Sequence, residues 1–326
     1  MERVRWRRDF APVLPPRGVV GRDPIGAVFG DWNIGVVIPA RNEIEHIKDV
    51  ISELPEWVDR IIVIDDGSTD GTGKAAEKAN VIRLEGEGVG AAIDAGHRDL
   101  LEHLEDPFIS VVMAGDGQMD VNDIEDVIKP IISGDFHHVK GDRSKHPDGL
   151  AKMPLLRKVG TALLAFLTTL ACGRKISDPQ CGYTATSFRI LRYWDWERSW
   201  KGYGYPNWWL MELTRKKYAI SQVPVRAIYD GQKSGLSIPL FLVKVAPMLL
   251  IGLHKRAFSW LQDDMANLQS FLGIPTAMFY AAGWGGIALS ILTLGEGFEI
   301  FFLLTLICWV IAHFIDRKWV AQKVTN

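Results

Sequence analysis

Apolar runs of strand length alternate with segments of helical apolar spacing from Ile34 to Ile132. In the first helical segment, Glu43–Leu54, apolar residues recur mostly at intervals of three positions. Continuous apolar strands that alternate with amphipathic helices indicate a parallel sheet covered by helices on both faces. We therefore predict an α/β domain with a Rossmann-like, parallel-rich sheet, whose first four strands are Ile34–Pro39, Arg60–Asp65, Asn80–Glu85 and Phe108–Met113.

A polar or glycine-rich segment follows each of these strands: ARNE, DDGSTDG, EGEGVG and AGDGQMD. Each alone has a plainer explanation, because Asp-Gly-Ser is a common turn and helix cap, and a glycine pair is a weak phosphate signal. Ligands in open parallel sheets bind at the carboxyl ends of the strands, where such segments meet. Together they predict a binding site at this edge, with Gly88 and Gly90 opening a helix whose N–H groups can meet a phosphate.

The segment AGDGQMD after the fourth strand predicts a weakened metal site. Acidic loops at such positions commonly carry Asp-x-Asp, but here Ala114 takes the first position and Asp116 remains. Mg²⁺ binds through one or two carboxylates together with substrate phosphates and water. Asp116 and the side-chain carbonyl of Gln118 are therefore sufficient ligands, whereas Asp120 is better explained as a helix cap.

Two apolar segments near the C-terminus predict a transmembrane hairpin. Phe271–Leu294 has no charged residue and would span about 36 Å as a helix, against a hydrocarbon core of about 30 Å. Ile300–Ile315 is a second, slightly shorter candidate, and only GEGFE separates the two. Basic residues flank the hairpin at Lys255, Arg256, Arg317 and Lys318, which favours a cytoplasmic location for both ends. A pair of buried helices in a soluble core is the alternative.

The predicted organisation has four parts. Residues 1–32 form an irregular basic extension, either a loosely ordered tail or a contact with anionic lipid, and no signal-peptide core follows it. Residues 33–237 form the α/β domain, in which a helical stripe between residues 155 and 170 fits either a core helix or the membrane interface. Residues 238–262 form interface helices, and residues 263–326 hold the hairpin, at about 271–294 and 298–315, and a cytoplasmic tail.

Composition excludes some classes of protein. Lys and Arg total 37 against 39 Asp and Glu, a net charge of -2, which argues against nucleic acid as a partner. The three Cys, at 172, 181 and 308, lack metal-ligand spacing and suggest a reducing, cytosol-facing catalytic part. The eight His residues form no catalytic constellation, and His137 and His138 lie on a predicted strand, where a structural role is expected.

Motifs over residues 36–237 resemble family-two glycosyltransferases of the GT-A type. VVIPARNE, VIDDGSTDGT, GVGAAIDAG and VVMAGDGQMD occur in the order and spacing of that family. VKGDR, DPQCGYTATS and GYGYPNWWLMEL extend the resemblance to the polyprenyl-phosphate sugar synthases, the dolichol-phosphate mannosyltransferase branch. The resemblance implies a membrane-bound inverting transferase that moves a sugar from a nucleotide sugar, of GDP-mannose or UDP-hexose type, to a polyprenyl or dolichyl phosphate.

The resemblance also implies roles for individual residues. Catalysis falls to Asp116 and Arg143, and Asp116 with Gln118 would hold Mg²⁺ or Mn²⁺ on the donor diphosphate. Arg143, with Arg157 as a second candidate, would face the acceptor phosphate. Three residues depart from the family pattern: Ala114 replaces an Asp, Val89 a frequent Lys, and Thr184 a frequent Arg. The implied nucleotide-sugar contacts are Pro39, Ala40, Arg41, Glu43, Asp65, Asp66, Gly90 and Gly115.

The expected reaction needs no general base. A phosphate monoester has a second pKa near ~6, so the lipid phosphate is mostly dianionic at neutral pH and can attack the anomeric carbon directly. Three alternatives remain open: a processive polysaccharide synthase, a nucleotidyltransferase and a non-catalytic sugar-nucleotide sensor in the membrane. The first lacks its Gln-x-x-Arg-Trp motif here, the second lacks a glycine-rich loop after Pro39, and the third has only Ala114 in its favour.

Overall fold

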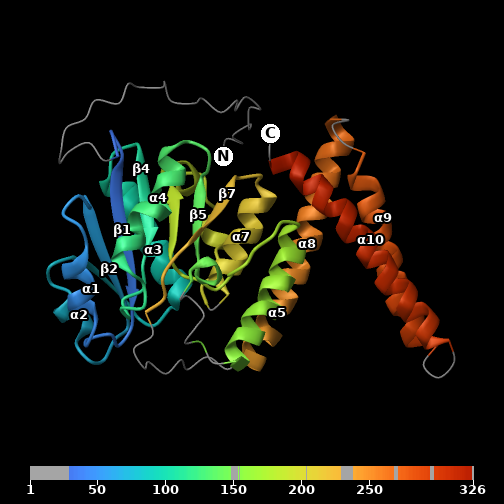
Figure 1. Ribbon diagram of the computed structural model, residues 1–326, viewed down its shortest axis with the longest axis horizontal. Helices are drawn as coiled ribbons and strands as arrows, with labels where there is room; N and C mark the ends of the chain where they lie inside the picture. The colour runs from blue at the N-terminus through green and yellow to red at the C-terminus, as the bar shows by residue number, and fades with distance from the viewer. Residues whose placement is uncertain are drawn as a thin grey trace, which may run out of the picture.

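The computed structural model contains a seven-stranded mixed sheet (Figure 1). It describes residues 29–147, 153, 155–202, 204–228, 238–267, 271–293 and 297–324. The strand order is β3-β2-β1-β4-β6-β5-β7, and β6 alone runs antiparallel to its neighbours. The prediction of a parallel-rich α/β fold is confirmed. The strands are β1 (Asn33–Ala40), β2 (Arg60–Asp66), β3 (Asn80–Leu84), β4 (Phe108–Val112), β5 (His138–Asp142), β6 (Thr184–Ser187) and β7 (Ile220–Pro224).

Helices cover both faces of the sheet because side chains of successive strand residues point to opposite sides. Val36 and Ile38 of β1 belong to the apolar cluster under α1 and α4, whereas Val37 belongs to the cluster under α3 and α7. The helices of this part are α1 (Ile47–Glu53), α2 (Thr72–Ala75), α3 (Val89–His103), α4 (Ile124–Ile132), α5 (Leu155–Cys172), α6 (Phe188–Leu191) and α7 (Tyr205–Arg215), with short 3₁₀ helices η1 (Val121–Asp123), η2 (Arg143–Lys145) and η3 (Trp196–Arg198).

The first helix is shorter than its apolar spacing predicts. The amide of Glu43 donates to Thr72 Oγ1 at 2.8 Å and the amide of Ile44 to Asp70 Oδ2 at 3.2 Å. Both bonds hold the start of the predicted helix as a loop against the segment after β2. The loop therefore remains beside the carboxyl ends of the strands, and α1 begins only at Ile47.

Three long helices follow the sheet domain: α8 (Ile238–Asn267), α9 (Gly273–Leu292) and α10 (Phe298–Val324). In Figure 1, α5 and α8 run side by side next to the sheet domain, and α9 and α10 project away from it as a hairpin. Both hairpin helices are long and apolar enough to cross a membrane. The two helices pack closely at two glycines, where a side chain would not fit. A Cβ at Gly283 would lie 2.1 Å from the Trp309 ring, and one at Gly286 would lie 2.2 Å from Thr305 Oγ1.

The last helix continues well beyond the predicted second span. Residues 316–324, predicted as part of a tail, are helical and pack on α8. Asp316 forms a fully buried ion pair with Arg256, and Asp264 accepts a hydrogen bond from Trp319 Nε1 at 2.7 Å. These polar contacts, which local hydropathy does not register, fix the open end of the hairpin to α8.

Candidate active site

The loops that carry the predicted site meet at one edge of the sheet. The parallel strands all end there, and the reversed direction of β6 brings the preceding loop Cys181–Tyr183 to the same edge. The loops after β1 and β2 are joined by hydrogen bonds: Asn42 N donates to Ser68 Oγ, and Thr69 N to Asn42 Oδ1, both at 2.9 Å. Asn42 adopts a positive φ of 57°, which is tolerable for Asn. The sequence did not single out this residue.

The two acidic residues at the end of β2 are buried and organise the neighbouring loops. Asp65 accepts the Ser68 amide at 2.8 Å and an Arg83 N–H at 3.0 Å. Asp66 accepts the amides of Glu87 and Gly88 at 2.7 and 2.9 Å, which fixes the turn before α3. Base recognition by these carboxylates remains a prediction.

Gly90 is needed for close packing at the start of α3. Its N–H donates to the carbonyl of Lys201 at 2.8 Å, and a Cβ there would lie 2.1 Å from the carbonyl oxygen of Trp200. The first-turn amide that the sequence assigned to a donor phosphate is therefore already paired. A nucleotide contact at Gly90 remains a prediction, and it would require another atom of the loop.

The predicted metal loop lies directly beside the loop after β1. Gly115 N donates to Pro39 O at 3.2 Å, and a Cβ at Gly115 would lie 3.1 Å from that of Ala40. Pro39, Ala40 and Gly115, three predicted nucleotide-sugar residues, are thus brought together. Asp116 Oδ1 accepts the amide of Gln118 at 3.0 Å, so both predicted ligands belong to one tight turn.

Burial raises the pKa of Asp116, although the Gln118 amide and the nearby His46 and Arg143 act to lower it. Burial also raises the pKa of Glu43, and the charge of Asp116 adds to this effect. A cation bound here would favour the ionised form of both carboxyl groups. The sequence missed His46, whose ring lies about 4 Å from where a Gly117 side chain would begin.

The donor set fits a divalent cation that shares its ligands with a substrate. Among the residues that the structure describes, no group of three or more His, Cys, Asp and Glu side chains could hold a metal ion. Asp116 and Gln118 would supply one carboxylate and one amide, and Mg²⁺ commonly takes its remaining ligands from substrate phosphates and water. This arrangement suits an ion that arrives with a diphosphate.

Arg143 begins η2 immediately after β5 and is held by Asp178. Nε and Nη2 donate to the two carboxylate oxygens at 2.7 and 2.9 Å, and the Arg143 amide donates at 3.2 Å. The guanidinium also lies close enough to Asp116 to lower its pKa. The fold therefore brings the predicted acceptor residue within electrostatic range of the predicted metal ligand, although 27 positions separate them in the sequence. The side chain of Arg157 lies outside the described residues.

A family model described as "Glycosyl transferase family 2" matches residues 35–194. The chain is 34% identical over 222 residues to the UDP-N-acetylglucosamine–dolichyl-phosphate N-acetylglucosaminyltransferase of Methanococcus voltae, covering 62% of this chain and 88% of the relative. This chain belongs to glycosyltransferase family 2. The prediction of an enzyme that transfers sugars is thereby confirmed.

Two further comparisons give a second relative in sequence and a solved structure of similar fold. The undecaprenyl-phosphate mannosyltransferase of Micrococcus luteus is 28% identical over 214 residues, covering 61% of this chain and 86% of the relative. The solved structure of glucosyl-3-phosphoglycerate synthase from Mycobacterium tuberculosis with uridine diphosphate has a TM-score of 0.52 and 24% identity, covering 71% of this chain and 82% of the other. The structural likeness shows that the two proteins share a fold.

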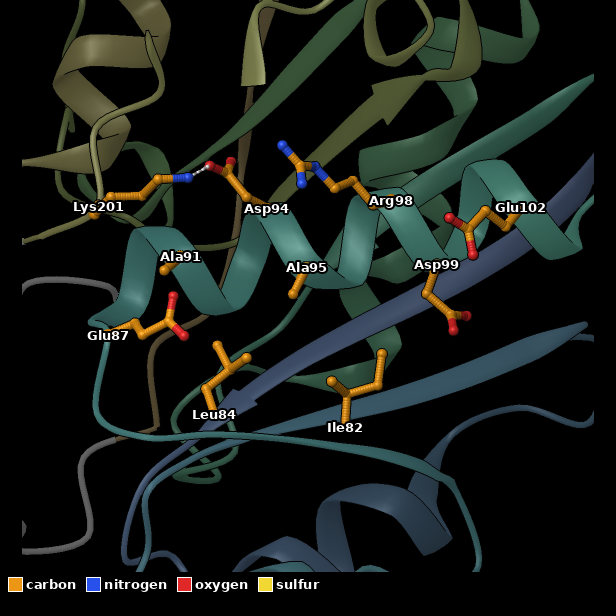
Figure 2. A pocket seen from close by; sticks show the side chains of 10 residues that line it. All are labelled: Ile82, Leu84, Glu87, Ala91, Asp94, Ala95, Arg98, Asp99, Glu102 and Lys201. Carbon is orange, nitrogen blue, oxygen red and sulfur yellow. Dashed lines mark hydrogen bonds and ion pairs between the residues drawn. The ribbon is translucent and has the colours of Figure 1, made fainter. Parts of the chain in front are cut away.

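The glycosyltransferase also has a cavity of about 340 Å³ between α3 and the edge strand β3. Figure 2 shows Ile82 and Leu84 of β3 beneath the small side chains of Ala91 and Ala95. Among the described residues, none of the predicted metal or acceptor residues lines it. The lining comes instead from β3, α3, Glu87 before α3, and Lys201.

Proposed function

We propose that this glycosyltransferase moves a sugar from a nucleotide sugar to the phosphate of a polyprenyl or dolichyl lipid, with inversion at the anomeric carbon. The observation that carries the proposal is that Arg143 lies within electrostatic range of the metal loop, and that an exposed apolar helix, α5, is the next helix in the chain. The Arg143 guanidinium is near Asp116, and the chain continues from η2 toward α5. One face of α5 exposes Leu155, Val159, Leu163 and Phe166.

This placement matches the chemistry of an amphiphilic acceptor. A polyprenyl phosphate presents a dianionic headgroup on a long apolar chain, so it needs positive charge next to apolar surface. The names of the M. voltae and M. luteus relatives specify dolichyl and undecaprenyl phosphate. Both names support a lipid phosphate as the acceptor here.

The donor would bind across the loops after β1, β2 and β4, with Asp65 and Asp66 near the base. Asp116 and Gln118 would hold Mg²⁺ or Mn²⁺ on its diphosphate, and the cation supplies charge neutralisation for the departing nucleoside diphosphate. Structures of the M. tuberculosis synthase contain Mn²⁺ and uridine diphosphate, which supports a divalent cation in this fold. Proposed donor contacts are Pro39, Ala40, Arg41, Glu43, Asp65, Asp66, Gly90 and Gly115.

Arg143 would hold the acceptor phosphate in line with the anomeric carbon. Its Nε edge is fixed by Asp178, so the guanidinium is pre-oriented. Pre-oriented positive charge offsets the repulsion between the acceptor and donor phosphates without reorganisation during the reaction. Arg157, whose backbone lies in the first turn of α5, is proposed as a second phosphate contact.

The hairpin of α9 and α10 is proposed to span the cell membrane, with the catalytic domain on the cytoplasmic side. The helix α8 exposes apolar residues along its length, which suits contact with the bilayer surface. These residues are Val243, Leu250, Ile251, Phe258 and Met265. This arrangement would bring the site close to a lipid headgroup.

The test is a transfer assay with the purified full-length protein and radiolabelled UDP-N-acetylglucosamine, UDP-glucose and GDP-mannose. The expected result is label in an organic-extractable product when dolichyl or undecaprenyl phosphate is present. The product should be lost on addition of EDTA and in Asp116→Ala. Transfer to 3-phosphoglycerate but not to lipid, or no transfer with any donor, would overturn the proposal.

A further inference from the structure

A short segment after β7, Val225–Ile228, crosses the metal loop and is called here the β7 extension. Ile228 N donates to the carbonyl of Gln118 at 3.0 Å, and Ala227 forms an antiparallel bridge with Met119. Ala227 and Ile228 lie more than 100 positions after Gln118 and Met119, and none of these four residues belongs to a regular strand. The contact joins the metal loop to the segment that leads toward α8.

The backbone of Gln118 is fixed on both sides by these contacts. Its N–H donates to Asp116 Oδ1 and its carbonyl accepts from Ile228. The direction in which its side chain leaves the backbone is therefore set jointly by the turn and by the β7 extension. This matters because Ala114 supplies no carboxylate, so that the proposed cation depends on Asp116 and Gln118 alone.

The β7 extension is itself held by the carboxylate of Asp123 in η1. Arg226 N donates to Asp123 Oδ2 at 2.7 Å, a short bond to a charged acceptor. The Arg226 side chain adds little, because its contact with Asp120 is 3.5 Å long and more than half exposed. At the other end, Val225 N donates to Asp142 O at 3.3 Å. Asp123 therefore provides the shortest side-chain contact that keeps the β7 extension on the metal loop.

We propose that Asp123 is a positioning residue for the metal site: its bond to the Arg226 amide holds the β7 extension against Gln118 and so orients the Gln118 side chain toward the cation. The inference rests on the proposed role of Asp116 and Gln118 as metal ligands. Groups that hydrogen-bond directly to a metal ligand commonly contribute 10- to 100-fold to affinity, and because Asp123 acts through the β7 extension, an effect at the lower end of that range is expected. Asp123 itself does not touch the metal.

The experiment measures Mn²⁺ binding to the full-length protein by the electron paramagnetic resonance signal of free Mn²⁺, in the presence of UDP and, separately, of GDP. Asp123→Ala should raise the Mn²⁺ dissociation constant by about 10-fold or more. Asp123→Asn should stay within about threefold of the wild type, because its amide oxygen still accepts the Arg226 N–H. Asp126→Ala is the matched control, since Asp126 is exposed one turn further on and pairs with Lys129.

The nucleotide affinity in EDTA separates a positioning role from misfolding, because it should be unchanged in Asp123→Ala. If the wild type binds Mn²⁺ and Asp123→Ala binds it equally well, the inference is wrong and the proposed function stands. Equal weakening in Asp123→Asn, or in Asp126→Ala, would also overturn it, because charge rather than hydrogen bonding would then be responsible. A wild type that binds no Mn²⁺ with either nucleotide would instead refute the metal site of the proposed function.

Discussion

The guanidinium of Arg143 and the carboxylate of Asp178 form a bidentate ion pair, with Nε–Oδ2 and Nη2–Oδ1 distances of 2.7 and 2.9 Å. Burial alone would raise the pKa of Asp178, but the hydrogen bonds and charge of Arg143 outweigh it, and the pKa is lowered. Asp178 therefore stays ionised at neutral pH and keeps Arg143 oriented. Arg143 is a rigid cation at the edge of the site, whereas an exposed arginine would be mobile.

Arg143→Ala should reduce sugar transfer to the lipid by about 10- to 150-fold, which corresponds to about 1.5–3 kcal/mol for a charge-assisted contact. Arg143→Lys should recover only part of this loss, because Lys cannot form the bidentate contact with Asp178. Steady-state kinetics with varied polyprenyl phosphate measures the effect, and calorimetry should show donor binding nearly unchanged. Lys145→Ala, in the same 3₁₀ helix and more exposed, is the control and should have little effect. Loss of donor binding in Arg143→Ala with unchanged lipid saturation would place Arg143 in the donor site.

Asp116→Ala should abolish nearly all turnover, because the cation that neutralises the diphosphate would lose its carboxylate ligand. Activity should require Mg²⁺ or Mn²⁺ and vanish in EDTA. Ala114→Asp should be tolerated or mildly activating, since it adds a carboxylate to the same loop. The assay is initial rate against metal concentration for the three proteins. Full activity in Asp116→Ala would show that the cation is held elsewhere or is not used.

Local patterns were enough to predict the first four strands, because each is a continuous apolar run that ends in a polar loop. The later strands were harder to predict. β6 reads Thr-Ala-Thr-Ser and β7 ends in Pro224, so neither has the apolar run of a buried strand. Their pairing with other strands explains why they are strands. β6 lies between β4 and β5 and pairs with both, and β7 pairs with β5.

The chemical character of the site was predictable, but its supporting contacts were not. The loops after the second and fourth strands pointed to Asp65 and Asp116, and the resemblance to the family added Arg143; the roles of all three stay predictions. The partners that orient the site come from distant positions: Asp178 lies 35 residues from Arg143, and Arg226 lies 103 from Asp123. No local pattern connects such pairs, because the sheet order alone brings them together.

Two buried histidines should make the catalytic domain less stable in acid. Burial lowers the pKa of both His97 and His138 to about 3, so the folded protein keeps them neutral while the unfolded chain takes up protons below about 6.5. Their contribution is complete above pH 6.5 and declines as pH falls toward 3. Between pH 6.5 and 5 each should cost about 2 kcal/mol.

Denaturant unfolding followed by tryptophan fluorescence at pH 7 and pH 5 measures this loss. His97→Gln should lower stability at pH 7 yet reduce the loss between the two pH values by about 2 kcal/mol. Carboxyl groups titrate equally in variant and wild type and cancel in the comparison. His103→Gln, at an exposed position of the same helix, is the matched control variant. An unaltered pH dependence in His97→Gln would contradict the prediction.

The ion pair between Arg256 and Asp316 should be costly to break from one side only. Both side chains are almost completely buried, and Nη2–Oδ2 is 2.6 Å. Asp316→Ala would leave a buried guanidinium without its counter-ion and should destabilise the protein by about 3–5 kcal/mol. The double variant Arg256→Met with Asp316→Leu should recover most of this loss. Unfolding in detergent is the measurement, with the exposed Arg317→Ala as control; equal loss in the single and double variants would contradict the prediction.

The distribution of basic residues around the hairpin predicts its topology in a membrane. No Lys or Arg occurs between Phe271 and Ile315, whereas Arg317 and Lys318 follow directly and are exposed. Arg256 is neutralised by Asp316, so the positive-inside bias rests on Arg317, Lys318 and the exposed Lys255. The open end of the hairpin, and with it the catalytic domain docked through α8, should be cytoplasmic. In a Cys308→Ser background, Glu296→Cys in intact cells should react with a membrane-impermeant maleimide. Ala321→Cys should react only after permeabilisation, and the reverse pattern would invert the topology.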